Sequence, residues 1–189
     1  MLPREKRVQR PPRSIIGRHS PAAHKPAAAT PGSRVAVTQL LALVDESYIL
    51  KAWHGPNLRG SIRGLDAAVA GWRPSAGRHS IAEIVVHCAY WKYTVRRRLL
   101  NERKGSVPLK GSNWFPRPER LSAAAWKGDL ELLGAMHDLL REAVAALTDR
   151  DLEHRPAGSK VTRGVILRGI ASHDVYHAGQ IQLLKRLMQ

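Results

Sequence analysis

The sequence predicts an all-α fold, a four-helix bundle that follows a disordered basic N-terminal tail. Apolar residues make up 43% of the 189 residues, as is typical of a globular chain. In four segments of about 20 residues these apolar side chains recur at helical spacing, and no segment reads convincingly as a strand. Helices of that size would be about 30 Å long, which suits a bundle.

The first 34 residues differ in composition from the rest of the chain. They hold eight Arg or Lys against a single Glu and are rich in Pro, Ala and Ser. Such a segment has too few apolar side chains to offset the entropy of ordering it. We therefore predict a disordered tail over residues 1–34 and one folded domain over residues 35–189.

The predicted domain begins with a helix from Val35 whose apolar side chains recur at helical spacing as far as Leu50. Gly55 and Pro56 are expected to end this helix. A short helical turn is predicted over residues 65–72, before the next proline.

A second long helix is predicted from Ile81 to the residue before Gly105. Ser80 and Glu83 have the spacing of a capping box, in which each side chain accepts the other's backbone N–H. A loop with three prolines is expected over residues 105–122, and a third helix over residues 126–147. Thr162 is a suitable N-cap for a fourth helix that runs to the end of the chain.

Two histidines, His173 and His177, lie four residues apart on the apolar stripe of the predicted fourth helix. His87 lies on the apolar stripe of the second helix, beside Trp91. Side chains at i and i+4 are close enough to bind one ion, and facing helices of a bundle often supply metal ligands. The alternative is that these imidazoles hydrogen-bond within the core. The residues alone leave both interpretations open.

The segments "HSIAEIVVHCAYW" and "IASHDVYHAGQIQLLKRL" resemble the DinB/YfiT-like four-helix bundle proteins. The resemblance covers most of residues 35–189. It implies that His87, His173 and His177 are metal ligands, with nickel or zinc as the divalent ion. It also implies a homodimer. Several proteins of this family are transferases or isomerases that use a low-molecular-weight thiol such as bacillithiol or mycothiol.

Three histidines and an open coordination position are typical of a catalytic metal site. Such a site activates a water or a thiol, so the predicted enzyme is a small-thiol S-transferase or a hydrolase acting on a small molecule. Beyond the activated water or thiol, the sequence assigns no catalytic group. Asp174 is a candidate to orient an imidazole or cap a loop. The candidates to line the cavity are Gln180, Trp91, His137 and Tyr176.

Two other functions are weighed against this prediction. A formal net charge of +16 raises the prospect of a nucleic-acid partner, but no DNA-reading motif or base-stacking platform accompanies the charge. A non-catalytic, metal-stabilised dimeric bundle is the other alternative. We expect a cytoplasmic protein with no membrane association, because no apolar run is long enough to span a bilayer and Cys88 is the single cysteine.

Overall fold

The computed structural model describes residues 32–103, 105, 109, 111 and 113–189. The predicted disordered tail therefore lies outside the described residues, apart from its last three positions. The described residues form helices and no β-strand, so the all-α prediction is confirmed. Among them, no helix has the length and apolar character needed to cross a membrane.

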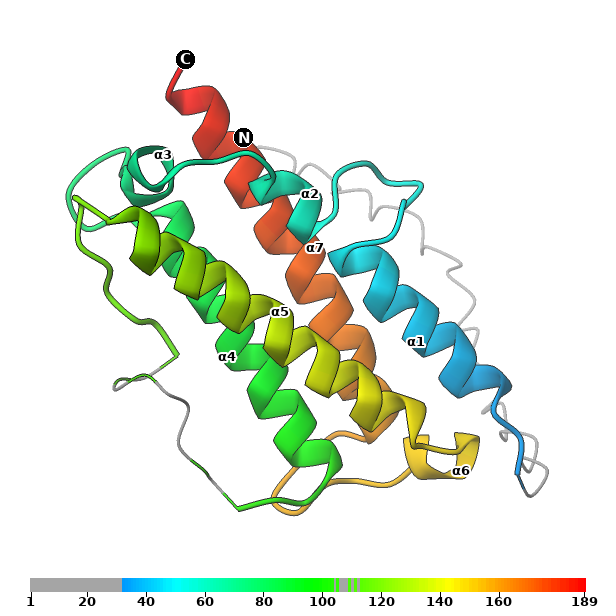
Figure 1. Ribbon diagram of the computed structural model, residues 1–189. Helices are drawn as coiled ribbons and strands as arrows, with labels where there is room; N and C mark the ends of the chain where they lie inside the picture. The colour runs from blue at the N-terminus through cyan, green and yellow to red at the C-terminus, as the bar shows by residue number, and fades with distance from the viewer. Residues whose placement is uncertain (1–31, 104, 106–108, 110, 112) are drawn as a thin grey trace, which may run out of the picture.

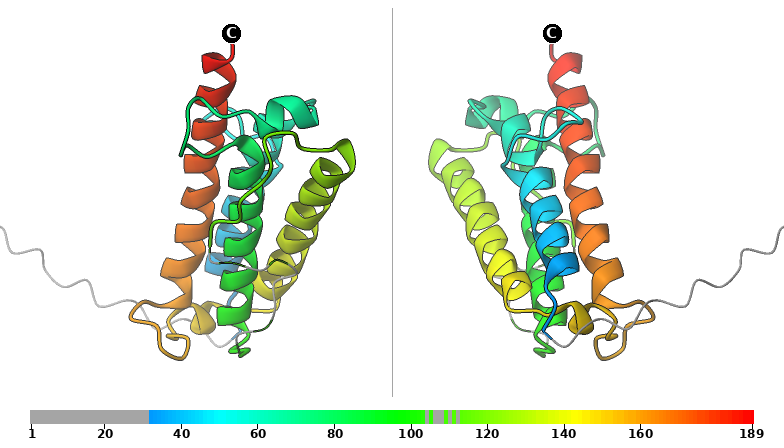
Figure 2. Two further views of the ribbon diagram at one scale, coloured as in Figure 1. Left: turned by 90° about the vertical axis from the view of Figure 1, so that its left-hand side faces the viewer. Right: turned by 90° about the vertical axis from the view of Figure 1, so that its right-hand side faces the viewer.

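Four long helices lie side by side and make the bundle (Figures 1 and 2). They are α1 (Val35–Tyr48), α4 (Ile81–Leu99), α5 (Ala123–Ala145) and α7 (Arg163–Leu187). Helix α4 packs against both α5 and α7, and α1 packs against α7. This arrangement confirms the predicted four-helix bundle.

Three short helices close the ends of the bundle (Figure 1). Helices α2 (Leu58–Ile62) and α3 (Ala67–Gly71) lie at one end, and α6 (Asp149–Leu152) lies at the other. The sequence predicts one helical turn in these regions, over residues 65–72, where α3 lies, and does not predict α2 or α6. Both are shorter than two turns, so they carry almost no hydrophobic periodicity.

The predicted capping box at the start of α4 is present. The Ser80 hydroxyl accepts from the Glu83 amide at 3.3 Å, and the Glu83 carboxylate accepts from the Ser80 amide at 3.1 Å. Helix α7 begins after Thr162, as predicted, and the Thr162 side chain accepts from the amide of Val165. These local contacts fix where the two helices that carry the histidines begin.

Several predicted helix ends differ from the structure. Helix α1 ends at Tyr48, before the predicted end near Gly55, and α4 ends at Leu99 instead of continuing to residue 104. Asn101, two residues beyond α4, has a positive φ of 54°, which an α-helix cannot continue through. Helix α5 begins at Ala123, earlier than predicted, because the Ser122 side chain caps it.

Candidate metal centre

Three histidines meet inside the bundle between α4 and α7; we call them the histidine triad. The Nε2 atom of His173 lies 3.1 Å from Nε2 of His87 and 3.1 Å from Nε2 of His177. One ligand nitrogen from each ring lies within 4.8 Å of the others. His87 and His177 are buried, and His173 is partly buried. The predicted triad is thus brought together by the fold.

The hydrogen bonds of the triad determine which ring nitrogens are free to act as ligands. His87 Nδ1 lies 2.7 Å from the carbonyl oxygen of Asn113, and His177 Nδ1 lies 2.7 Å from Oε1 of Gln180. Both oxygens are acceptors, so each Nδ1 carries the proton and donates it. In a neutral imidazole the other nitrogen then has a lone pair. Nε2 of His87 and Nε2 of His177 therefore both present lone pairs towards His173.

Burial keeps the triad neutral. It lowers the pKa of His173 to about 3 and that of His177 to about 4, with the neighbouring histidines adding to both shifts. Burial also lowers the pKa of His87, partly opposed by the hydrogen bond to Asn113. Neutral imidazoles are the form that binds metal ions, so protons do not compete for these nitrogens near pH 7.

The donor set fits a divalent transition metal. Imidazole nitrogens bind zinc at about 2.0–2.1 Å, which puts two nitrogens of a tetrahedral site about 3.3 Å apart. The two Nε2 separations of 3.1 Å are close to this value. Hydrogen bonds cannot account equally well for the geometry, because a single ring, that of His173, would have to donate one proton to two lone pairs.

A stack of aromatic rings supports one side of the triad. The Trp114 ring lies between His87, at a centroid distance of 3.9 Å, and His79, at 3.7 Å. The loop that carries Trp114 is held at Glu83, whose carboxylate accepts from Arg73 and from the backbone amide of Arg117. Burial acts to raise the pKa of Glu83, but these hydrogen bonds outweigh it and lower the pKa to about 2. This anchor stays ionised and keeps the Asn113 carbonyl near His87.

The four residues predicted to line the cavity have different positions. Trp91 lies beside the triad, with its ring centroid 6.1 Å from that of His173, and Gln180 holds His177. Tyr176 lies next to His177 but is 62% exposed, so it is at the surface. His137 stacks on the Tyr48 ring at 3.9 Å and makes no contact with the triad.

Asp174 does not orient an imidazole, in contrast to the prediction. Its carboxylate accepts from the ammonium of Lys92, and both side chains are fully buried. Lys92 Nζ also lies 3.5 Å from His137 Nδ1, and His137 Nε2 lies 3.4 Å from the carboxylate of Asp45. We call Lys92, Asp174, His137 and Asp45 the lysine cluster. Asp174 turns towards it because residue 174 lies about 100° around the helix from His173.

Lys92 was not among the predicted site residues, although its place in the sequence carries a signal. The charged residue sits in an apolar stripe of α4, where a lysine needs a buried partner. The other members of that stripe, all buried, are Val85, Cys88, Val95 and Leu99.

A second group of metal-type ligands lies nearby but does not suit an ion. Cys88, His173 and Asp174 offer atoms within 4.8 Å of one another. Burial raises the pKa of the Cys88 thiol well above its usual value, so the thiolate ligand is disfavoured. The Asp174 carboxylate already binds Lys92, whose positive charge would repel a cation.

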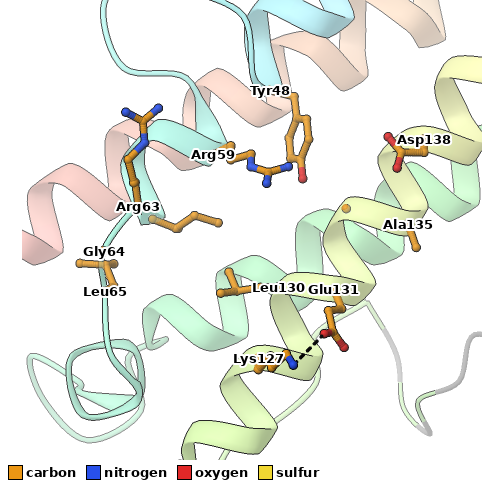
Figure 3. Close-up of a pocket in the computed structure, with 12 residues that line it drawn as sticks. Tyr48, Arg59, Arg63, Gly64, Leu65, Lys127, Leu130, Glu131, Ala135 and Asp138 are labelled. Atoms are coloured by element: carbon orange, nitrogen blue, oxygen red, sulfur yellow. Dashed lines mark ion pairs between the residues drawn. The ribbon is translucent and has the colours of Figure 1, made fainter.

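A separate cavity of about 720 Å³ lies between α2 and α5 (Figure 3). Its walls carry opposite charges: Arg59 lies beside the Tyr48 hydroxyl, and Lys127 forms an ion pair with Glu131 at 3.7 Å. None of the residues that line it belongs to the histidine triad. This cavity therefore offers polar contacts but no convergent set of metal ligands.

The fold and the site together define a class: four-helix bundles with an internal three-histidine set that could hold a divalent metal ion. The family model of the DinB superfamily matches residues 52–181, which is more than half of the chain and includes all three histidines. The chain therefore belongs to the DinB superfamily, whose members include metal-binding enzymes. No curated protein and no solved structure gives a significant match.

Proposed function

We propose that the protein is a divalent-metal-dependent enzyme that acts on a small molecule, with His87, His173 and His177 as the metal ligands. The observation that carries the proposal is the convergence of three neutral Nε2 atoms, two of them with lone pairs set by hydrogen bonds at Nδ1. A divalent ion, nickel or zinc in this proposal, would supply a Lewis-acid centre that activates a thiol or a water.

The chain's own residues orient the ligands and limit access of water. The Asn113 carbonyl and the Gln180 amide hold two of the rings by their Nδ1 protons. Trp114 covers one face of His87, and Trp91 borders the site near His173. Partners of this kind fix the ligand tautomers and raise the basicity of ligating histidines.

Two reactions suit such a site: transfer of a low-molecular-weight thiol to an electrophile, and hydrolysis. Both need a nucleophile that is ionised near neutral pH. In this proposal the enzyme acts in the cytoplasm, where a small-thiol cosubstrate would remain reduced. Cys88 is not the nucleophile in either reaction, because its thiol is buried and its pKa is raised.

The test is turnover by tag-free protein with and without metal. A panel of small thiols with an electrophile, and a panel of esters and amides, would be assayed for wild type and His173→Ala. We expect turnover that disappears on metal removal, returns when the ion is restored, and is absent from H173A. His154→Ala is the matched control, because His154 is exposed and contacts the Arg150 carbonyl, away from the triad. Turnover that survives metal removal contradicts the proposal.

A second candidate is a non-catalytic dimeric bundle that metal stabilises. The observation that favours it is a stripe of exposed side chains on the outer face of α7, formed by Tyr176, Leu183 and Leu187, which are 57–62% exposed. Burying such a stripe against a second copy would remove apolar surface from water. A stable dimer whose melting temperature follows metal, without turnover on any panel, would favour this candidate.

A further inference from the structure

A groove between α4 and α7 leads along the bundle to the histidine triad. It has a volume of about 250 Å³. We call it the α4–α7 groove. Two of its lining side chains, His173 and Arg98, are polar or charged, and the remainder of the lining is apolar or backbone. The other lining residues are Trp91, Val95, Ile166, Gly169 and Ile170.

The groove has a metal-ligand end and a cationic end. Helices α4 and α7 pack together and run in opposite directions (Figure 1). Trp91 lies beside His173, so Arg98, seven residues later on α4, is level with Ile166, seven residues earlier on α7. Seven residues separate the two levels on each helix, which is about 10 Å along the axis. A molecule in the groove would thus have one end near His173 and the other near Arg98.

The surroundings of Arg98 favour a negatively charged group. Arg98 forms no ion pair with any of the described residues. It also lines an adjoining cavity of about 420 Å³, together with Arg97 and Lys160. Among the described residues that line that cavity, Glu102 is the one acidic side chain, and it is paired with Arg96 at 2.8 Å. The cationic end of the groove therefore has an excess of positive charge.

Gly169 lines the middle of the groove and is exposed. A Cβ atom added at this position would meet no other atom within 4 Å. A larger side chain at residue 169 would therefore fit without a clash, and because Gly169 lines the groove, that side chain would occupy part of it. This offers a way to block the groove while leaving the triad and Arg98 in place.

We propose that the α4–α7 groove binds a substrate with a small apolar body and a carboxylate, and that Arg98 binds the carboxylate. The apolar walls match the body, and the guanidinium is the side chain best suited to paired hydrogen bonds with a carboxylate. This inference rests on the proposed function, because it names the class of substrate for the same site.

The test is a titration with hexanoate and, as the matched uncharged ligand, 1-hexanol. Binding to the full-length chain, zinc-loaded and metal-free, would be followed by NMR through the indole N–H signal of Trp91. We expect hexanoate to bind up to about fivefold more tightly than hexanol, since Arg98 is exposed and an exposed ion pair contributes up to about this factor. Arg98→Gln should remove the difference between the two ligands.

Two further variants make the result specific. Arg168→Gln removes the same charge from α7 beside Gly169, and Arg168 lines neither the groove nor the adjoining cavity, so this variant should keep the preference for hexanoate. Gly169→Leu should weaken both ligands at least tenfold while the NMR spectrum keeps its dispersion. Equal binding of the two ligands, equal effects of R98Q and R168Q, or unchanged binding by G169L would overturn the inference. If the protein does not bind zinc, the proposed function is wrong. The groove inference is still tested in that case, because the titration of the metal-free protein needs no ion.

Discussion

Consecutive residues of α7 belong to two buried polar groups with opposite character. His173 belongs to the histidine triad, and Asp174 belongs to the lysine cluster. In the lysine cluster a buried cation meets a buried anion, so the chain supplies its own partner. In the triad three neutral imidazoles face one another, and two of them present lone pairs. Burial of polar groups alone does not indicate a ligand site; the balance of donors and acceptors does.

The largest effect on stability is expected in the lysine cluster. Lys92→Met leaves the Asp174 carboxylate buried without its cation and should lower the free energy of unfolding by about 3–5 kcal/mol. Urea denaturation would measure this loss. The double variant K92M/D174L should lose much less, because no charge remains unpaired. Equal losses in the single and double variants would show that Asp174 does not need Lys92.

The triad should respond to metal where the lysine cluster does not. Zinc at 100 times its dissociation constant should stabilise wild type by about 2.7 kcal/mol, or about 5–11 °C in melting temperature. His173→Ala should lose this shift and His137→Gln should keep it, because His137 lies in the lysine cluster. Thermal unfolding with and without a chelator is the measurement. A shift that persists in H173A would place the ion elsewhere.

Gln180 should matter for metal affinity more than for folding. Replacing it with Ala removes the acceptor of the His177 Nδ1 proton and should weaken metal binding about 10–100-fold. That factor corresponds to about 1.4–2.7 kcal/mol. Competition with a chromophoric chelator would measure it. Gln182→Ala is the control, since Gln182 contacts Ser61 and not a histidine; equal effects of Q180A and Q182A would contradict the assigned hydrogen bond.

The smallest effect is a pH dependence from the lysine cluster. Burial, with the positive charges of Lys92 and Arg141, lowers the pKa of His137 to about 3. The Asp45 carboxylate lies near His137 Nε2 but is itself bound by Arg141. The pKa in the unfolded chain is about 6.5, so the unfolded state binds the proton first as the pH falls. The stability from neutral His137 is therefore complete above about pH 6.5 and is lost towards pH 3.

Urea denaturation between pH 7.5 and 5 would test this dependence. Wild type should lose about 1–2 kcal/mol more than His137→Gln over this range, because one pH unit is worth about 1.4 kcal/mol for one such group. The comparison between the two proteins cancels the titration of all other groups. Parallel pH profiles would show that His137 takes up its proton at the same pH in the folded protein as in the unfolded chain, which would contradict the lowered pKa.

The sequence was sufficient to predict features that depend on neighbouring residues. The capping box of Ser80 and Glu83 and the Thr162 cap predicted where α4 and α7 begin, because a cap is formed within one turn. The spacing of His173 and His177 predicted that they share a helix face. The histidines of two helices could be expected to meet because both lay on apolar stripes that face the core.

Contacts between distant segments could not be predicted in the same way. The Asn113 carbonyl reaches His87 from a loop 26 residues away, and any residue type supplies such a carbonyl. Lys92 and Asp174 are 82 residues apart, so only the fold shows that they pair. Helix α6 was missed although Thr148 and Asp151 form its capping box, because four residues are too few to show a helical repeat.

X-ray absorption at the metal edge of tag-free protein tests the central claim most directly. The predicted result is one divalent ion per chain with three imidazole nitrogens at about 2.0–2.1 Å, and loss of the ion in H173A. A sulfur neighbour at about 2.3 Å would instead assign the ion to Cys88. That result, or wild-type protein that binds no stoichiometric divalent ion when one is supplied, would contradict the histidine triad as a metal centre.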